Sequence, residues 1–307
     1  MVVSLSMSDP EKRAVTPKRA STLILVGQEG KEIQICLLRR STKSSFMPGN
    51  YVFPGGTVGS EDWDPSFWGA HLDLAPGEIL NRFCERLTEE EAIAHGVAAI
   101  RETFEEAGVF LCEGDIQNLD LVKAYHRLRL TKGLHKGWLK DWVGSGGGAL
   151  SFSRLTPWAH WTSPEIMSQR FDTRFFLALM PLEQECIPDE IEITHGIWVT
   201  PEEGLFRNLR GDIPLSPPAV VTLHELLQYQ DTAHLKKGIE NFSWGGERMP
   251  RSTPCAEGPL LLLPWDPMYS GQVAVDSMKG MSGKILPLGE GFSRLWFNKG
   301  RWVPVGI

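Results

Sequence analysis

One nine-residue stretch, Arg101-Glu102-Thr103-Phe104-Glu105-Glu106-Ala107-Gly108-Val109, concentrates the side chains that can do chemistry. At about 100° per residue, a helix places Glu102, Glu105 and Glu106 on one face, because they are three and four positions apart. Three carboxylates on one turn repel one another and raise one another's pKa unless a cation neutralises them. Mg²⁺ is typically held by a few carboxylates together with phosphate oxygens of a substrate. The spacing predicts a divalent-metal site, and the alternative is a solvated acidic face with an Arg101–Glu105 ion pair.

The flanking residues predict the helix that would carry these carboxylates. Thr88 and Glu91 form a capping-box pattern, with Thr at the N-cap and Glu at the third helical position. Gly108 suits the left-handed residue that ends a helix. We therefore expect a helix from about residue 89 to residue 107. Phe104 and its apolar neighbours should face a core, with the carboxylates pointing away from it.

The segment Phe53-Pro54-Gly55-Gly56-Thr57 precedes this helix, and together the two resemble the Nudix hydrolase signature. That signature runs Gly, five residues, Glu, seven residues, then Arg-Glu-U-x-Glu-Glu-x-Gly-U, where U is aliphatic. Thr103 replaces the first aliphatic residue. Between Gly56 and Arg101 lie 44 residues, 31 more than in the signature. Counted back from Arg101, the isolated glutamate falls on Ile93, so its role has no assigned residue.

The resemblance implies the fold, the metal and the catalytic residues. The fold would be an α/β/α sandwich with a mixed sheet, two insertions and a C-terminal extension. The cofactor would be Mg²⁺ or Mn²⁺, held by Glu105 and Glu106 with the Gly56 carbonyl. Glu102 would be a further metal ligand or the general base, and Arg101 would hold a glutamate in its productive rotamer. A distal carboxylate is expected from the acidic loop before the 197–200 strand, at Glu190 or Glu192.

Several segments resemble the peroxisomal-type coenzyme A diphosphatase branch of the family. They are the run from Ser45 to Gly56, the long insertion, the run from Arg170 to Phe176, and the run from Leu262 to Tyr269. The substrate implied is coenzyme A or an acyl-CoA, cleaved to 3′,5′-ADP and 4′-phosphopantetheine or its acyl form. Ser45 stands where a coenzyme A signature has a second arginine, so an ADP-ribose or NAD(H) diphosphatase is the main alternative. A non-catalytic nucleotide-binding module is a further alternative, which the intact glutamates disfavour.

A diphosphate substrate requires cationic and close backbone contacts, because it carries about two negative charges and arginine binds phosphate through two donors. The expected substrate-binding residues are Arg39, Arg40, Phe53, Gly55, Arg170 and Arg174.

The order of apolar runs and turn residues predicts an α/β chain. Residues 1–19 are expected to form a flexible tail. Residues 20–235 would form the Nudix domain, with insertions at about 57–88 and 113–156, and residues 236–307 a C-terminal extension packed on it. Strands are expected at 21–26, 32–39, 51–53, 109–111, 155–162, 170–179 and 196–199. Helices are expected at 76–87, at 120–134 with residues 138–143 extending it, from Thr200, and from Pro217 to Tyr229.

Composition limits the partners. The net charge of −7, from 31 basic and 38 acidic residues, disfavours nucleic-acid binding. The five cysteines are scattered and form no C-x-x-C, which is typical of reduced thiols in the cytoplasm. No apolar run approaches the roughly 20 residues of a membrane span. We therefore expect a cytoplasmic enzyme acting on a small nucleoside diphosphate derivative, with a homodimer left open.

Overall fold

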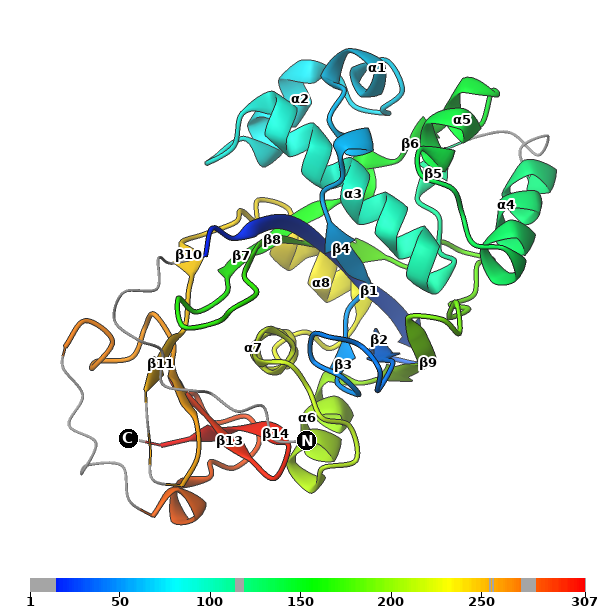
Figure 1. The fold of residues 1–307 in the computed structure, drawn as a ribbon. Coiled ribbons are helices and arrows are strands. Elements are labelled where there is room, and N and C mark those ends of the chain that lie inside the picture. Colours follow the sequence, from blue (N-terminus) through cyan, green and yellow to red (C-terminus); the bar gives the residue numbers. More distant parts are fainter. Residues whose placement is uncertain (1–14, 114–118, 254, 256, 272–279, 307) are drawn as a thin grey trace.

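A mixed eight-stranded sheet forms the centre of the molecule (Figure 1). The computed structural model describes residues 15–113, 119–253, 255, 257–271 and 280–306. The strands follow the order β10-β7-β8-β1-β2-β3, with β4 paired to β1 and β9 paired to β2. Their bounds are β1 Lys18–Glu29, β2 Glu32–Arg40, β3 Tyr51–Val52, β4 Gly55–Thr57, β7 Thr156–Thr162, β8 Phe171–Leu179, β9 Ile193–Val199 and β10 Glu247–Arg248.

The central strand β1 joins the two halves of the sheet. It runs parallel to β8 and antiparallel to β2 and β4, so Ser21 lies opposite Arg174 on one side and Gly56 on the other. Side chains alternate between the faces of a strand. Leu23 therefore packs in the core beneath α3 (Glu89–Ala107), whereas Ile24 packs in the core on the opposite face.

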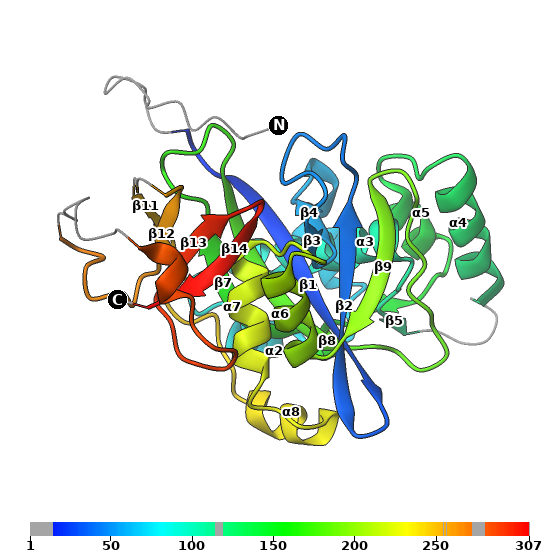
Figure 2. The ribbon, with the colours of Figure 1, turned by 90° about the horizontal axis from the view of Figure 1, so that it is seen from below.

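Helices cover both faces, which confirms the α/β/α sandwich. On the first face α3 is joined by α1 (Pro65–Gly69) and α2 (Pro76–Phe83), and by α4 (Leu119–Thr131) and α5 (Trp138–Gly144) beyond its end. On the second face lie α6 (Pro201–Arg210) and α7 (Pro217–Leu226), in front of the strands in Figure 2. Helix α8 (Thr232–Ile239) and the short helices η1 (Ser60–Asp62), η3 (Phe152–Arg154) and η5 (Met281–Lys284) complete the helical elements described.

The C-terminal residues form a second sheet against this face. Its order is β11-β12-β13-β14, with bounds Arg251–Thr253, Leu260–Leu262, Arg294–Asn298 and Arg301–Val305. Leu261, Leu263 and Leu295 belong to the same buried cluster as Val220 of α7. The extension therefore shares the core of the main sheet.

Most expected elements are present, and three differ. The predicted strand at 109–111 is wrong, because that segment is buried without a ladder partner and the strand is β5 (Cys112–Glu113), paired with β6 (Ala149–Leu150). The segment expected to extend the 120–134 helix is the separate helix α5, since Gly137 adopts a φ of 87° before it. Strand β1 begins at Lys18, inside the expected tail, whose first 14 residues lie outside the described part of the chain.

Among the described residues, no helix has the length and apolar character needed to cross a bilayer.

Candidate active site

Helix α3 presents the carboxylates because both of its ends are fixed. The Thr88 hydroxyl accepts the Glu91 N–H, and the Glu91 carboxylate accepts the Thr88 N–H at 3.0 Å, so the predicted capping box is present. Gly108 ends the helix with a φ of 71°. Thr103, which stands where an aliphatic residue was expected, is buried and donates to the Ala99 carbonyl at 2.7 Å. Its hydroxyl is thus satisfied within the helix and leaves the core undisturbed.

The carboxylate face of α3 is not a solvated surface, contrary to the expectation that it points away from the core. Glu106 is only 5% exposed, and the side chains of Glu102 and Glu105 are 15% and 30% exposed. Gly55 and Gly56 of β4 cover this face together with η1 and α5, so carboxylates that repel one another are held in a partly dehydrated site.

Gly55 and Gly56, at the start of β4, lie directly against two of the glutamates. The Gly55 N–H donates to Glu106 Oε2 at 2.9 Å. A Cβ built on Gly56 would lie 2.4 Å from the Glu102 carboxylate. Only glycine at position 56 permits this approach, because real Cβ atoms do not come within 3.0 Å of other heavy atoms. The pairing of β4 with β1 therefore brings the two halves of the motif together in space.

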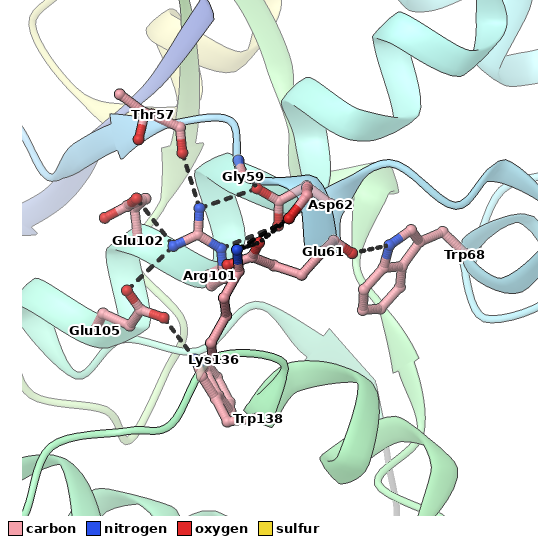
Figure 3. A network of polar contacts seen from close by, with 11 residues as sticks. Thr57, Gly59, Glu61, Asp62, Trp68, Arg101, Glu102, Glu105, Lys136 and Trp138 are labelled. Carbon is pink, nitrogen blue, oxygen red and sulfur yellow. Dashed lines mark hydrogen bonds and ion pairs between the residues drawn. The ribbon is translucent and has the colours of Figure 1, made fainter.

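Arg101 is the hub of the polar network shown in Figure 3. It donates to Asp62 through Nε and Nη2, at 3.0 Å each, and to the Thr57 carbonyl at 2.9 Å. Its Nη1 donates to Glu102 at 2.9 Å and to Glu105 at 3.1 Å. The expected Arg101–Glu105 pair is present, but it is one part of a buried network that fixes both glutamate rotamers.

Asp62 is a candidate site residue that the sequence interpretation missed. It is 1% exposed, forms two hydrogen bonds with Arg101, and accepts the Gly59 N–H at 2.7 Å. The signal was present, since Gly56 followed by five residues leads to Asp62, where the signature has its isolated glutamate. Counting back from Arg101 led instead to Ile93, because the insertion follows the isolated acid and does not precede it.

Burial dominates the electrostatics of the three glutamates. It raises the pKa of Glu102 to about 7, against the charge of Arg101 and together with that of Glu105. Burial also raises the pKa of Glu105, and it raises that of Glu106 far above the usual range, where the charge of Glu102 adds to it. Burial lowers the pKa of Arg101, but its hydrogen bonds to Asp62 and the surrounding carboxylates raise it more, so the guanidinium stays charged.

These residues fit a divalent cation. Asp62, Glu102 and Glu105 share the Arg101 guanidinium, and Glu106 lies within reach of the charge of Glu102. The ionised forms of these four acids therefore leave an excess of negative charge near α3 for a cation to neutralise. Across the described part of the chain, no group of three or more acidic, histidine or cysteine side chains is arranged to hold a metal ion by itself. An open site of this kind is what Mg²⁺ uses when substrate phosphates and water supply its remaining ligands.

Two further predicted residues lie near Glu106. Besides burial, the pKa of Glu106 is lowered by the charge of Arg40 and raised by that of Glu192, so both lie within electrostatic reach. Arg40 is held by Ser44 Oγ at 2.8 Å and by the Phe46 carbonyl at 3.0 Å. The backbone of Glu192 is tied to the same loop, because its carbonyl accepts the Ser41 N–H.

Glu190 and Glu192 are both exposed in the loop before β9, and Glu190 has a φ of 62°. The Asp189 carboxylate organises that loop by accepting the N–H groups of Ile191, Glu192 and Ile193. Of the two predicted distal carboxylates, Glu192 is therefore the one that the structure places near the glutamate helix.

Arg39 and Phe53 lie on the opposite face of the sheet from the glutamates. Along β2, Arg40 has the parity of Leu38, which packs in the core beneath α3, whereas Arg39 has the parity of Leu37 in the other core. Phe53 is 4% exposed in that second core. The structure does not bring these two residues to the glutamates.

Arg170 and Arg174 also lie away from the glutamates. Arg170 donates to the Ser163 and Val15 carbonyls and fastens the start of β8. Arg174 packs over the Trp244 ring and lies near enough to Glu91 for that charge to act on its pKa, after the larger effects of burial and Asp172. Glu91 and Glu102 are eleven positions apart along α3, which corresponds to a helix rise of about 16 Å. Arg174, beside Glu91, is therefore far from the glutamates.

Comparisons with known proteins agree with the motif found in the sequence. Residues 17–144 match a family model described as the NUDT19 Nudix domain. A Xenopus laevis protein named acyl-coenzyme A diphosphatase NUDT19 is 29% identical over 292 residues, covering 78% of this chain and 72% of its own length. The Homo sapiens protein of that name is 27% identical over 281 residues, covering 77% of this chain and 72% of its own.

A solved structure supports the fold. The crystal structure of a Nudix hydrolase from Alicyclobacillus acidocaldarius superposes with a TM-score of 0.58 at 24% identity. The match covers 76% of this chain and 100% of that chain.

Proposed function

Since this chain belongs to the Nudix hydrolase family, we propose that it hydrolyses the diphosphate of coenzyme A or an acyl-CoA with Mg²⁺ or Mn²⁺. The products are 3′,5′-ADP and 4′-phosphopantetheine or its acyl form. The observation that carries the proposal is the contact of Glu102 and Glu106 with Gly55 and Gly56 of β4. It occurs in a chain that aligns over about three quarters of its length with proteins named acyl-coenzyme A diphosphatase.

The glutamates divide the work of binding and proton transfer. Glu105 and Glu106 are the proposed metal ligands, with the Gly56 carbonyl beside them. When bound, the metal polarises the phosphoryl oxygens and lowers the pKa of the attacking water. Glu102 is suited to accept that water's proton, because its pKa of about 7 matches a general base that works near neutral pH.

Arg101 and Arg40 have different tasks. Arg101 uses its donors on Asp62, Glu102, Glu105 and a backbone carbonyl, so it orients the acids and does not bind substrate. Arg40 is fixed near Glu106 through Nε and Nη2, and no described residue accepts from its Nη1, which can therefore donate to a substrate phosphate. We propose Arg40 as the phosphate-binding arginine, a role that its preorganised guanidinium favours.

The decisive experiment is a competition among equal concentrations of CoA, dephospho-CoA, NADH and ADP-ribose with Mg²⁺, the products being separated by chromatography. We expect 3′,5′-ADP and 4′-phosphopantetheine to form first. The Glu106→Gln variant, purified in parallel, controls for contaminating phosphatases. A kcat/KM for CoA at least tenfold below that for ADP-ribose or NADH would overturn the choice of substrate and leave the hydrolytic chemistry standing.

Three finer points belong to the same proposal. Replacing Mg²⁺ by Mn²⁺ in the assay identifies the preferred metal. Sedimentation at micromolar protein concentration tests the homodimer. Cell fractionation tests the cytoplasmic location, which we propose from the scattered cysteines.

A further inference from the structure

We propose that Trp138, in the second insertion, is a positioning residue for Glu105 and thereby for metal binding. This inference rests on the proposed function, because it takes Glu105 as a metal ligand. It assigns a task to the segment of about residues 113–156, which is an insertion with no counterpart in the signature motif.

The contact itself is short and directed. Trp138 Nε1 donates to Glu105 Oε1 at 2.6 Å, while Arg101 Nη1 donates to Glu105 Oε2 at 3.1 Å (Figure 3). Each carboxylate oxygen thus receives one donor, and each keeps a lone pair for a cation. Two donors approaching from different elements fix the rotation of the carboxylate, which a single bond to Arg101 does not.

Trp138 is a rigid donor. Its side chain is 1% exposed, and its ring packs against Phe104, Phe110 and Tyr125 at centroid distances of 5.0, 5.9 and 5.5 Å. Phe104 belongs to α3, one residue before Glu105. The indole therefore packs on the same helix that carries the carboxylate. The N–H is therefore already in place when the metal arrives.

The rest of α5 anchors this donor to the first insertion. Lys140 Nζ lies 2.8 Å from Asp64 Oδ2 and packs over the Phe67 ring. Lys136, two residues before the helix, has its Nζ 3.3 Å from Glu61 Oε2, next to the Arg101 partner Asp62. The second insertion thus contacts the residues on either side of Asp62, so that Asp62 holds Arg101 while Trp138 holds Glu105.

Without the indole, Arg101 would be the remaining donor to Glu105 among the described residues. The carboxylate could then turn fully toward the guanidinium and present less of itself to the cation. Losing a hydrogen-bond partner of a metal ligand typically costs about 10- to 100-fold in metal affinity or activity. The loss should therefore appear in metal binding before any substrate is added.

The chain offers a matched control in Trp142, four residues along the same helix. Its side chain is also fully buried and packs on Phe110, but among the described residues its indole nitrogen has no hydrogen-bond partner. Trp142→Phe removes the same atoms from the same core as Trp138→Phe, without removing a donor to Glu105. Any effect shared by the two variants is therefore a packing effect.

The test measures Mn²⁺ binding to the full-length protein by electron paramagnetic resonance of free Mn²⁺, and then kcat and KM. We expect Trp138→Phe to weaken Mn²⁺ binding about 10- to 100-fold, and Trp142→Phe to change it less than about twofold. In a Glu105→Gln background, Trp138→Phe should add no more than about a twofold further loss, because coupled residues are non-additive. Replacing Trp138 with benzothienylalanine, which keeps the ring and lacks the N–H, provides a second variant if Trp138→Phe folds poorly.

Equal effects of the Trp138 and Trp142 variants, or full additivity with Glu105→Gln, would overturn the inference. So would wild-type Mn²⁺ affinity in the benzothienylalanine protein. The binding measurement decides the matter even if CoA proves not to be the substrate, so failure of this inference and failure of the proposed function are distinguishable.

Discussion

Replacing Asp62 with asparagine tests whether the hidden acid organises the site. The two Arg101–Asp62 contacts measure 3.0 Å each, and the side chains are 8% and 1% exposed. Removing one partner of such a buried pair leaves an uncompensated charge and typically costs about 3–5 kcal/mol. Asparagine keeps one acceptor oxygen but turns an amide donor toward the guanidinium. We therefore expect a loss near the lower end, about 3 kcal/mol.

The same substitution should reduce catalysis beyond its effect on stability. Freed from Asp62, the Arg101 guanidinium can shift toward Glu102 and Glu105, which already accept from its Nη1. We expect kcat/KM to fall about 10- to 100-fold under conditions where the variant is fully folded. Asp62→Glu restores the residue type of the signature motif and should retain most activity.

Two measurements decide the question, namely urea unfolding followed by tryptophan fluorescence and initial rates of substrate hydrolysis with saturating Mg²⁺. Asp64→Asn is the control, because Asp64 is a half-buried neighbour that pairs with Lys140 and not with Arg101, and asparagine can still accept the Phe67 N–H that caps α1. Unchanged unfolding midpoint and unchanged kcat/KM in Asp62→Asn would refute the role given to this carboxylate.

Four further outcomes follow from the same geometry. Glu106→Gln should lower kcat by roughly 100-fold or more while leaving the unfolding midpoint intact, because it removes one preorganised charge from the site. Gly56→Ala should reduce activity and Mn²⁺ affinity together, since its Cβ would displace the Glu102 carboxylate 2.4 Å away. Glu192→Gln should weaken metal binding or turnover more than Glu190→Gln does, and full activity in both variants would exclude the distal carboxylate. Because the folded-state pKa of Glu102 is about 7, above its usual 4.5, the metal-free protein should lose about 3 kcal/mol of unfolding free energy from this group as pH rises from 4.5 to 7. Urea unfolding at several pH values should show this decline, and Mg²⁺ at neutral pH should reverse it.

Local patterns were sufficient to predict the element that carries the glutamates. Thr88, Glu91 and Gly108 mark the ends of α3 by interactions within a few residues of one another, so they can be recognised without knowing the fold. Strands β1 and β2 were predictable as well, because each is a short run of apolar residues that can be recognised locally. By contrast, the burial of the carboxylate face was not, because the segments that cover it are distant in sequence.

The substrate arginines show where residue type alone fails. Arg39 and Arg40 are neighbours and were predicted together, yet strand alternation places only Arg40 on the side of α3. Arg170 and Arg174 were chosen from a resemblance to a motif, but their partners are backbone carbonyls and the Trp244 ring. Trp138 has no sequence signal at all, since its contact with Glu105 arises from tertiary packing of an insertion.

The long insertion does not separate the parts of the motif because β1 holds both. Ser21 pairs with Gly56 across the ladder, and its hydroxyl is 3.0 Å from His95 Nδ1 on α3. Burial lowers the pKa of His95 to about 4, so the imidazole is neutral and serves as a hydrogen-bonding contact between helix and strand. Ser21 of β1 thus holds both β4 and α3. The chain between Asp62 and Arg101 can therefore lengthen without moving the glutamates. The signature spacing is therefore one way to reach this geometry, and the position of Asp62 beside Arg101 is the part that has to be kept.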